Sequence, residues 1–295
     1  MKKTSHTCDC MGIPVVATNL KSAVHTVCGH LQEHRGDYMT FVNVHTLVTA
    51  VENGEYKRAQ EMSAYSFADG TPVAKLQRKK GYIEAKRVTI PAWVLSSKAI
   101  HISPRTLAGP DFMDAVLKIS PDKGYRHYFY GSTPDNIGRL VEAVSEKYPG
   151  VEIVGSCAPE FVETMDADTF EEIFAKDIAE IEKASPDFIW VGLGAPKQEL
   201  WMMHAQGCVS GLMAGVGAAF DFMSGEKKRA PVVLQKLGLE WFYRLMQDPR
   251  RLFPRYIETN IKFLKLYLKD SLHHERASIC RDVKTEVNEQ LYDEL

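Results

Sequence analysis

Short runs of β-branched and aromatic residues alternate along this chain with stretches whose apolar residues recur at helical spacing. Such a run followed by an amphipathic stretch is typical of a strand and the helix after it. Repetition of this unit predicts an α/β fold, a Rossmann-like parallel sheet with helices on both faces. The predicted strands are 38–44, 126–130, 151–154, 187–192 and 211–216.

Helical patterns follow most of these runs. We predict helices over about 46–64, over 137–148 up to the turn Pro149-Gly150, over 170–184 and over 199–206. In such sheets ligands bind beyond the carboxyl ends of the strands, where loops and helix N-termini converge. The loops after the predicted strands are therefore where we look for chemistry.

Composition narrows the class of protein. The 295 residues suffice for one large α/β domain with an appendage, and a net charge of −2 argues against a nucleic-acid partner. We see no apolar run long enough to span a membrane and no secretory signal. Six scattered cysteines suit reduced thiols in a cytoplasm. His6, Cys8 and Cys10 match no common zinc spacing, so a frayed N-terminus is the interpretation we prefer.

From residue 227 the character of the chain changes. Between Lys227 and Lys269 there are eleven Lys or Arg residues against three Asp or Glu, interleaved with aromatic residues. An apolar stripe at helical spacing fits either core packing or contact with an anionic membrane, and the pattern favours neither. We predict a catalytic core over 1–226, a basic, largely helical appendage over 227–270 and a polar tail over 271–295. The stripe consists of Ile257, Ile261, Leu264 and Leu268.

Asp69 and Gly70 form the first candidate site. An Asp-Gly pair is by default a turn, and on spacing alone that interpretation is the stronger one. A carboxylate in a loop at the ligand-binding edge of a sheet would instead suit a general base that deprotonates a sugar hydroxyl.

Glycine-bearing turns follow three of the predicted strands. Glycine lets the backbone approach a phosphate, and the next helix offers N–H donors and a partial positive charge. The alternative for each turn is a tight strand-to-helix connection without a ligand. Asp221 would orient a ribose or sugar hydroxyl, or else cap a helix and contact nothing. The candidate ligand contacts in these turns are Gly131, Gly192, Gly194, Lys197, Gln198, Glu199, Gly215, Gly217 and Asp221.

Asp166-Ala167-Asp168 has the letters of a metal-binding Asp-x-Asp motif. Asp168 with Glu171 is better interpreted as a capping box that opens the helix over 170–184. We therefore expect no metal and no cofactor. Basic side chains would then have to neutralise a leaving diphosphate, and the appendage offers Arg244, Arg250, Arg251 and Arg255.

Several longer stretches occur together in one order. They are Ala68-Asp69-Gly70, Ala108-Gly109-Pro110-Asp111, the run 191–199 (VGLGAPKQE), the run 215–221 (GVGAAFD), Lys228-Arg229-Ala230-Pro231, and the run 235–241 (QKLGLEW) with Arg244.

In these stretches, which cover most of residues 38–268, the chain resembles the WecG/TagA/CpsF family of glycosyltransferases. The resemblance implies an inverting enzyme that moves a sugar, often N-acetylmannosamine, from a UDP-sugar to an undecaprenyl-diphosphate-linked saccharide. The products feed teichoic acid, common antigen, capsule or exopolysaccharide. It makes Asp69 the catalytic base, which reverses the turn interpretation. It also selects Arg244, Arg251 and Arg255 as the appendage arginines that reach the active site, and brings the appendage to the inner face of the bacterial cell membrane.

The sequence departs from the family pattern in two places. The family commonly has a threonine two residues before the asparagine that ends the first strand, but here Phe41 precedes Asn43 at that distance. Thr40 and Thr46 are both near, and we include Asn43 and Thr46 among the substrate contacts. The segment 82–104 is longer than the family pattern and contains Arg87-Val88-Thr89, a competing match to the same motif. We expect this insertion either to alter the choice of acceptor or to damage activity.

Two other classes of function stay open from the residues alone. One is a nucleotide-binding oxidoreductase, although the glycine turns lack the third glycine of the dinucleotide fingerprint. The other is a non-catalytic module that binds a membrane surface. A homo-oligomer would follow if the apolar stripe of the appendage were not packed on its own core.

Overall fold

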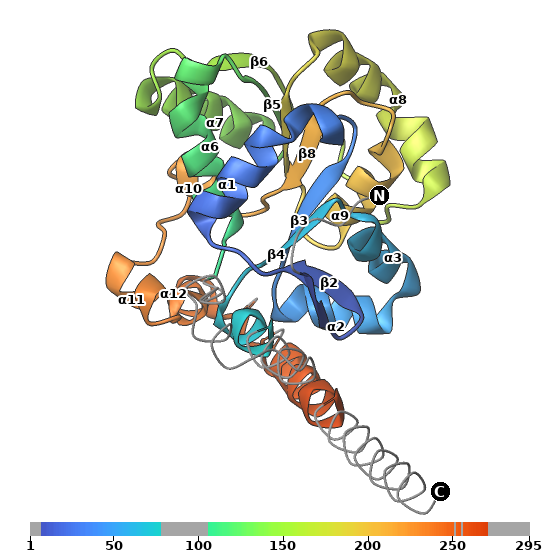
Figure 1. The fold of residues 1–295 in the computed structure, drawn as a ribbon, viewed down its shortest axis with the longest axis vertical. Helices are drawn as coiled ribbons and strands as arrows, with labels where there is room; N and C mark the ends of the chain where they lie inside the picture. Colours follow the sequence, from blue (N-terminus) through green and yellow to red (C-terminus); the bar gives the residue numbers. More distant parts are fainter. Residues whose placement is uncertain (1–6, 78–105, 251, 255, 271–295) are drawn as a thin grey trace, which may run out of the picture.

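A computed structural model of the protein describes residues 7–77, 106–250, 252–254 and 256–270. Its centre is an eight-stranded sheet with strand order β1-β2-β4-β3-β8-β7-β5-β6 (Figure 1). All neighbouring strands pair in parallel except β1 and β2, which form an antiparallel hairpin at one edge. The strands are β1 Thr7–Cys10, β2 Ile13–Val16, β3 Tyr38–Val42, β4 Tyr65–Ala68, β5 Arg126–Gly131, β6 Glu152–Cys157, β7 Phe188–Gly192 and β8 Leu212–Gly215.

Helices cover both faces of the sheet, which confirms the predicted fold class. One face carries α2 Val44–Glu52, α3 Gly54–Met62, α8 Ala167–Ala184 and α9 Lys197–Ala205, and their apolar sides share one core cluster. The other carries α1 Leu20–Gly29, α6 Gly109–Lys123, α7 Pro134–Lys147 and α10 Ala219–Met223, with a second cluster. A 3-10 turn, η1, spans Leu31–His34.

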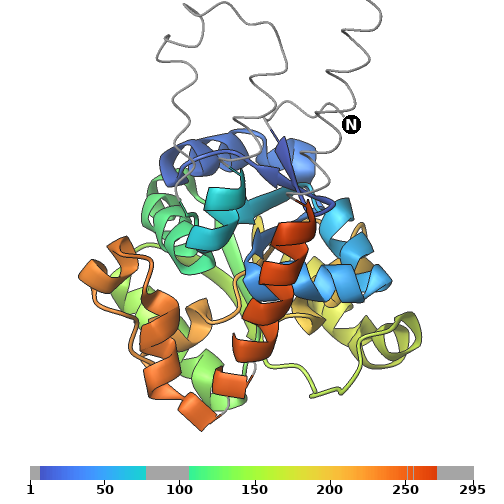
Figure 2. The same ribbon diagram turned by 90° about the horizontal axis from the view of Figure 1, so that it is seen from below.

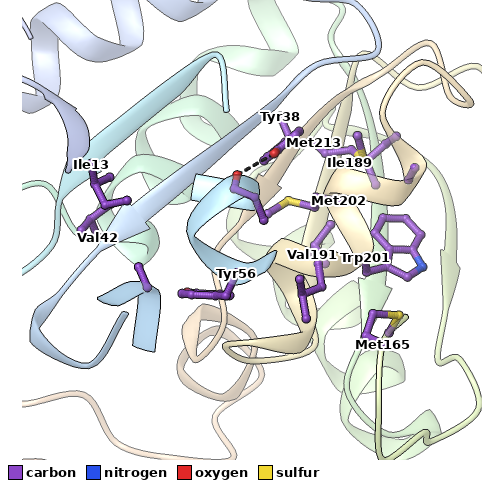
Figure 3. Packing of buried hydrophobic residues seen from close by; sticks show 14 of the residues in the cluster. Ile13, Tyr38, Val42, Tyr56, Met165, Ile189, Val191, Trp201, Met202 and Met213 are labelled. Carbon is purple, nitrogen blue, oxygen red and sulfur yellow. Dashed lines mark hydrogen bonds between the residues drawn. The ribbon is translucent and has the colours of Figure 1, made fainter. Parts of the chain in front are cut away.

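The first of these clusters is continuous from the strands into the helices. Trp201 of α9 stacks on Tyr130 of β5 with ring centroids 4.3 Å apart. The Tyr38 hydroxyl donates to the carbonyl oxygen of Ala59 at 2.6 Å, which ties β3 to α3 (Figure 3). Central parallel strands are buried on both faces and therefore read as nearly continuous apolar runs. This explains why the sequence predicted β3, β5, β7 and β8 within two residues at each end.

The prediction of a frayed N-terminus was wrong. Residues 7–10 are not frayed, because they form β1 and pair with β2 through the turn at Met11 and Gly12. The carboxylate of Asp9 closes that turn by accepting a hydrogen bond from the Gly12 N–H at 2.6 Å.

The predicted helix 46–64 is two helices. Asn53 ends α2 and caps α3, since its side-chain oxygen accepts the Tyr56 N–H at 2.9 Å. The chain then enters β4, which the sequence did not predict. β4 has only four residues, and its Ser66 is buried against Thr40 with hydroxyl oxygens 3.0 Å apart. A short strand with a polar residue lacks a clear apolar pattern, although both its faces are buried.

The cap of α8 also differs from the prediction. Asp166, not Asp168, is the N-cap, and its carboxylate accepts the Thr169 N–H at 2.9 Å. Asp168 lies exposed in the first turn, where a negative charge favours the helix dipole.

The appendage begins after α10 and is helical, as predicted. It comprises α11 Val232–Lys236, α12 Glu240–Gln247 and a helix over 256–270. Figures 1 and 2 show these helices at the end of the molecule where α2 begins. The 256–270 helix is joined to α2 by an ion pair between Lys262 and Glu52 at 2.7 Å. The predicted division at residue 226, the tail 271–295 and the insertion 82–104 stay predictions, and the last two lie outside the described residues.

Candidate active site

Asp69 stands at the carboxyl end of β4, beside the end of β3. Its backbone N–H donates to the carbonyl oxygen of Val42 at 2.8 Å, which extends the pairing of the two strands by one step. Next to it, Asn43 caps α2 by accepting the Thr46 N–H at 3.1 Å. Because the Asn43 oxygen is used in this cap, its side-chain amide faces Asp69 as a hydrogen-bond donor.

The environment of Asp69 leaves its carboxyl partly protonated and partly ionised at neutral pH. Burial raises its pKa to about 7, and the nearby carboxylates Glu240 and Asp111 act in the same direction. Arg244 and the hydrogen bond from Asn43 oppose this rise. The residue as a whole is partly exposed. A group with a pKa near the working pH is well suited to take a proton from a substrate hydroxyl.

A topological switch point lies at the carboxyl ends of β3 and β8. β3 and β8 are neighbours, yet the helix after β3 lies on one face of the sheet and the helix after β8 on the other. Connections that diverge in this way leave a switch point between them, the usual ligand site of open α/β sheets. Asn43 and Asp69 lie on one side of this point, and Gly215 and Gly217 on the other.

The glycine turns are tight because other backbone and ring atoms fill the space of a side chain. A Cβ on Gly131 would lie 2.6 Å from the carbonyl carbon of Gly192, and one on Gly192 would lie 2.5 Å from the Phe220 ring. Gly131 also adopts a φ of 124°, which disfavours any L side chain. Both turns are therefore tight connections that require glycine, and the N-termini of α7 and α9 follow them.

The charged and polar residues after β7 point in different directions. Lys197 donates to the carbonyl oxygen of Val162 and stacks over the exposed Phe161 ring at 4.0 Å. The Gln198 amide donates to Glu199 at 2.7 Å and to the Gly215 carbonyl oxygen at 3.3 Å. Glu199 is fully buried, and burial raises its pKa to about 7. Glu199 thus lies beneath the glycine turns, and Gln198 contacts the turn after β8.

Asp221 does contact other residues. It pairs with Lys227 and accepts a hydrogen bond from the Asn136 amide at 3.2 Å. Asn136 in turn donates to Ser132 at 2.7 Å, in the loop after β5. Asp221 therefore ties α10 to the start of α7, and the alternative in which it contacts nothing is wrong.

The two threonines have different surroundings. Thr40 donates to Gln60 at 2.9 Å in the interior and faces α3. Thr46 completes a capping box by accepting the Asn43 N–H at 2.8 Å. Thr46 is the one that reaches the candidate site, where it fixes Asn43 beside Asp69.

Arg244 of α12 is the appendage arginine that the structure brings to Asp69. Its guanidinium carbon lies 5.4 Å from the centre of the Phe222 ring, and no carboxylate of the described residues forms an ion pair with it. Gly238, just before α12, touches Thr71, two residues after Asp69. Arg251 and Arg255 lie outside the described residues. This packing brings Arg244 near Asp69, although the two residues are far apart in the sequence.

Residues 8–100 and 92–277 match the glycosyl transferase WecG/TagA/CpsF family. The chain belongs to this family. Similar proteins are N-acetylglucosaminyldiphosphoundecaprenol N-acetyl-beta-D-mannosaminyltransferases. The one from Bacillus spizizenii is 26% identical over 271 residues, 90% of each chain. The Bacillus subtilis one is 28% identical over 257 residues, 85% of this chain and 89% of the relative. The Staphylococcus aureus (strain MW2) one is 28% identical over 204 residues, 69% of each.

The family assignment makes this protein a glycosyltransferase and decides against the oxidoreductase and the non-catalytic module. In this glycosyltransferase no group of three or more His, Cys, Asp or Glu among the described residues is arranged to hold a metal ion. None of the helices within the same ranges combines the length and apolar character needed to cross a bilayer.

Sequence reasoning missed three residues that the structure places around Asp69. Asp111 and Glu240 act on Asp69 electrostatically, and Arg229 holds both of them by ion pairs. All three occur in the stretches that carry the family resemblance, which was the available signal. Their meeting depends on how α6 and α12 pack.

Proposed function

We propose that this glycosyltransferase moves a sugar, with inversion and without a metal, from a UDP-sugar to an undecaprenyl-diphosphate-linked saccharide. The names of the relatives support the acceptor and favour N-acetylmannosamine as the sugar. The observation that carries the proposal is Asp69, a partly exposed residue whose carboxyl has a pKa of about 7, beside the switch point of the sheet and near Arg244, which has no ion-pair partner among the described residues. The polymer would be a cell-surface polysaccharide of the teichoic acid, capsule or exopolysaccharide kind.

Asp69 acts as the general base in this proposal. Its carboxylate takes the proton from the acceptor hydroxyl while that oxygen attacks the anomeric carbon of the donor sugar. The bond from the anomeric carbon to the diphosphate oxygen breaks on the opposite side, so the configuration inverts and UDP leaves with the bonding electron pair. Asn43, held by Thr46, keeps the carboxyl oriented by its amide donor.

The donor diphosphate would lie along the glycine turns. The N–H groups at the start of α7 and α9 face this edge of the sheet, and no atom lies within 4 Å of a Cβ placed on Gly194, which leaves room for close approach there. Arg244 supplies positive charge for the leaving diphosphate because no carboxylate of the described residues neutralises it. Arg251 and Arg255 are proposed for the same role from the sequence.

The appendage would place the site at the inner face of the cell membrane. In the 256–270 helix, Phe263 and Tyr267 pack against the first core cluster. A different face of this helix exposes the predicted stripe of Ile257, Ile261, Leu264 and Leu268, each 45–57% exposed. An apolar face flanked by lysines suits an anionic bilayer, and a second copy of the chain is the competing occupant.

A transfer assay tests the proposal. The protein would meet a panel of UDP-sugars and a short-chain lipid-diphosphate-GlcNAc acceptor, with and without EDTA, and both UDP release and product mass would be read. We expect acceptor-dependent UDP release that survives EDTA. Asp69→Asn should lower kcat by about 10²- to 10⁴-fold, the range of a general base, with UDP binding retained. Asp168→Asn, an exposed aspartate of the Asp-x-Asp letters, is the matched control and should transfer normally.

Two results would refute the proposal in different ways. Full activity of Asp69→Asn would remove the base assignment. Transfer that is abolished by EDTA and restored by Mg²⁺ or Mn²⁺ would remove the metal-independent mechanism while leaving the base in place.

A further inference from the structure

Arg229 joins the core to the appendage through one guanidinium group. Two of its nitrogens donate to the carboxylate of Asp111, Nη1 to Oδ1 at 2.5 Å and Nη2 to Oδ2 at 3.1 Å. Its Nε donates to the Glu240 carboxylate at 3.1 Å. Asp111 is in the first turn of α6, which belongs to the core, and Glu240 opens α12. We call these three residues the clasp.

The clasp is sheltered. The side chains of Arg229 and Glu240 are 23% and 26% exposed, and that of Asp111 is 40% exposed. Bidentate arginine–carboxylate pairs fix direction as well as distance, which a single contact of a lysine does not. The two carboxylates hold the pKa of Arg229 above its ordinary value, so the group stays charged.

The clasp lies beside the catalytic base. Both of its carboxylates raise the pKa of Asp69, and Arg244, one turn along α12 from Glu240, lowers it. Other contacts hold the same junction, since Gln247 at the end of α12 donates to the Lys228 carbonyl oxygen at 2.9 Å. Because Arg244 lies one turn along α12 from Glu240, its position beside Asp69 depends on how the first turn of α12 is held.

Arg229 differs from Arg244 in what it offers a substrate. Its Nε and both Nη nitrogens already face carboxylates, so it would have to leave them to bind a diphosphate. Arg244 has no such partner among the described residues. Arg229 is thus suited to act through α12, whereas Arg244 is suited to act on the substrate.

We propose that Arg229 is a positioning residue, whose pairs with Asp111 and Glu240 seat α12 on the core and hold Arg244 against the loop of Asp69. This inference rests on the proposed role of Asp69 and Arg244 in sugar transfer. It assigns the Gly-Pro-Asp and Arg-Ala-Pro stretches of the sequence to one device, the junction of core and appendage.

The experiment reads the seating of α12 and the transfer reaction separately. Chymotrypsin cleaves at aromatic residues, and Trp241, Phe242 and Tyr243 lie in α12, so its cleavage there reports local opening. Trypsin is unsuitable for this comparison, because changing Arg229 would itself remove a trypsin site. For Arg229→Gln we expect cleavage in 241–243 about 10- to 100-fold faster, the range for losing a charge-assisted hydrogen bond.

Transfer by Arg229→Gln should fall about 10- to 100-fold in kcat/KM, because a small displacement of a catalytic group has that effect. Asp111→Asn should change both readouts in the same direction, and the double variant should be no worse than Arg229→Gln alone, since that change already removes the pair with Asp111. Arg139→Gln, which breaks an exposed ion pair with Glu226 elsewhere on the core, is the matched control and should change neither readout.

Any other combination of the cleavage and transfer results overturns the inference. Wild-type cleavage with reduced transfer would mean that Arg229 acts on substrate directly. Faster cleavage with wild-type transfer would mean that α12 need not be seated. If Arg229→Gln does not fold by circular dichroism, Arg229→Lys keeps the charge and loses the bidentate pair, and the same two readouts apply. Asp69→Asn separates the two proposals, because it should lower transfer by about 10²- to 10⁴-fold while α12 is cleaved at the wild-type rate.

Discussion

The ionisation of Asp69 makes a quantitative prediction about the pH dependence of transfer. A base acts only when deprotonated, so kcat/KM should rise with pH and level off above the pKa of the base. With a pKa of about 7, the ionised fraction falls from about one half at pH 7 to about one hundredth at pH 5. We therefore expect kcat/KM to drop roughly 50-fold between pH 7 and pH 5. An aspartate with an ordinary pKa near 3.9 would change by only about a tenth over the same interval.

A second carboxyl must be separated from the first in this measurement. Burial raises the pKa of Glu199 to about 7 as well, and Glu199 lies beneath the glycine turns. The Glu199→Gln variant should keep the acid limb of the profile, whereas the small residual activity of Asp69→Asn should not show it. Initial rates would be measured from pH 5 to pH 8.5 at constant ionic strength, with circular dichroism at each pH to confirm folding.

Either of two results would refute the reasoning. A flat profile between pH 5 and pH 7 would mean that the pKa of Asp69 is not raised or that it is not the base. Loss of the acid limb in Glu199→Gln would assign the titration to Glu199. The same shift predicts that Asp69→Asn has a higher Tm than the wild type at pH 8, because the wild type must then hold a buried negative charge.

Three further predictions concern stability and the membrane. His127 is buried and neutral, with its pKa lowered by burial to about 3, so the unfolded chain takes up a proton first as the pH falls below 6.5. Urea unfolding should therefore show about 2 kcal/mol less stability at pH 5 than at pH 7 from this residue, and His127→Gln should lack that part. Gly131→Ala, which meets the Gly192 backbone at a positive φ, should lose UDP binding and destabilise the fold, whereas Gly138→Ala in open space on α7 should stabilise it by roughly 0.5–1 kcal/mol. Thermal unfolding and UDP titration would check this, and equal behaviour of the two variants would contradict it. Leu264→Gln, 57% exposed on the outer stripe, should weaken flotation with anionic vesicles and leave the Tm unchanged. Phe263→Ala, on the inner side, should lower the Tm, and unaltered flotation of Leu264→Gln would favour a second copy as the occupant.

The amino-acid sequence by itself determined the fold class, because the central strands are apolar on both faces and each is followed by a helical pattern. It also determined the positions of the glycine turns and the helical appendage with its apolar stripe. The residues that carry the family resemblance selected Asp69, although its Asp-Gly pair alone indicates only a turn. A local pattern contains no information about the charge around a side chain, and so the raised pKa of Asp69 was not predictable from it.

Tertiary structure decided the rest, in each case through contacts between residues far apart in the chain. The strand β4 depends on packing against β3, where the hydroxyl of Ser66 meets that of Thr40. Glu199 was expected to touch substrate, but the helix α9 turns it into the interior. The clasp joins α6 to α12, and no spacing in the sequence indicates that Arg229 would face Asp111. Periodicity along a chain fixes which face of an element is apolar, whereas the partners of a charge are fixed only when the elements pack.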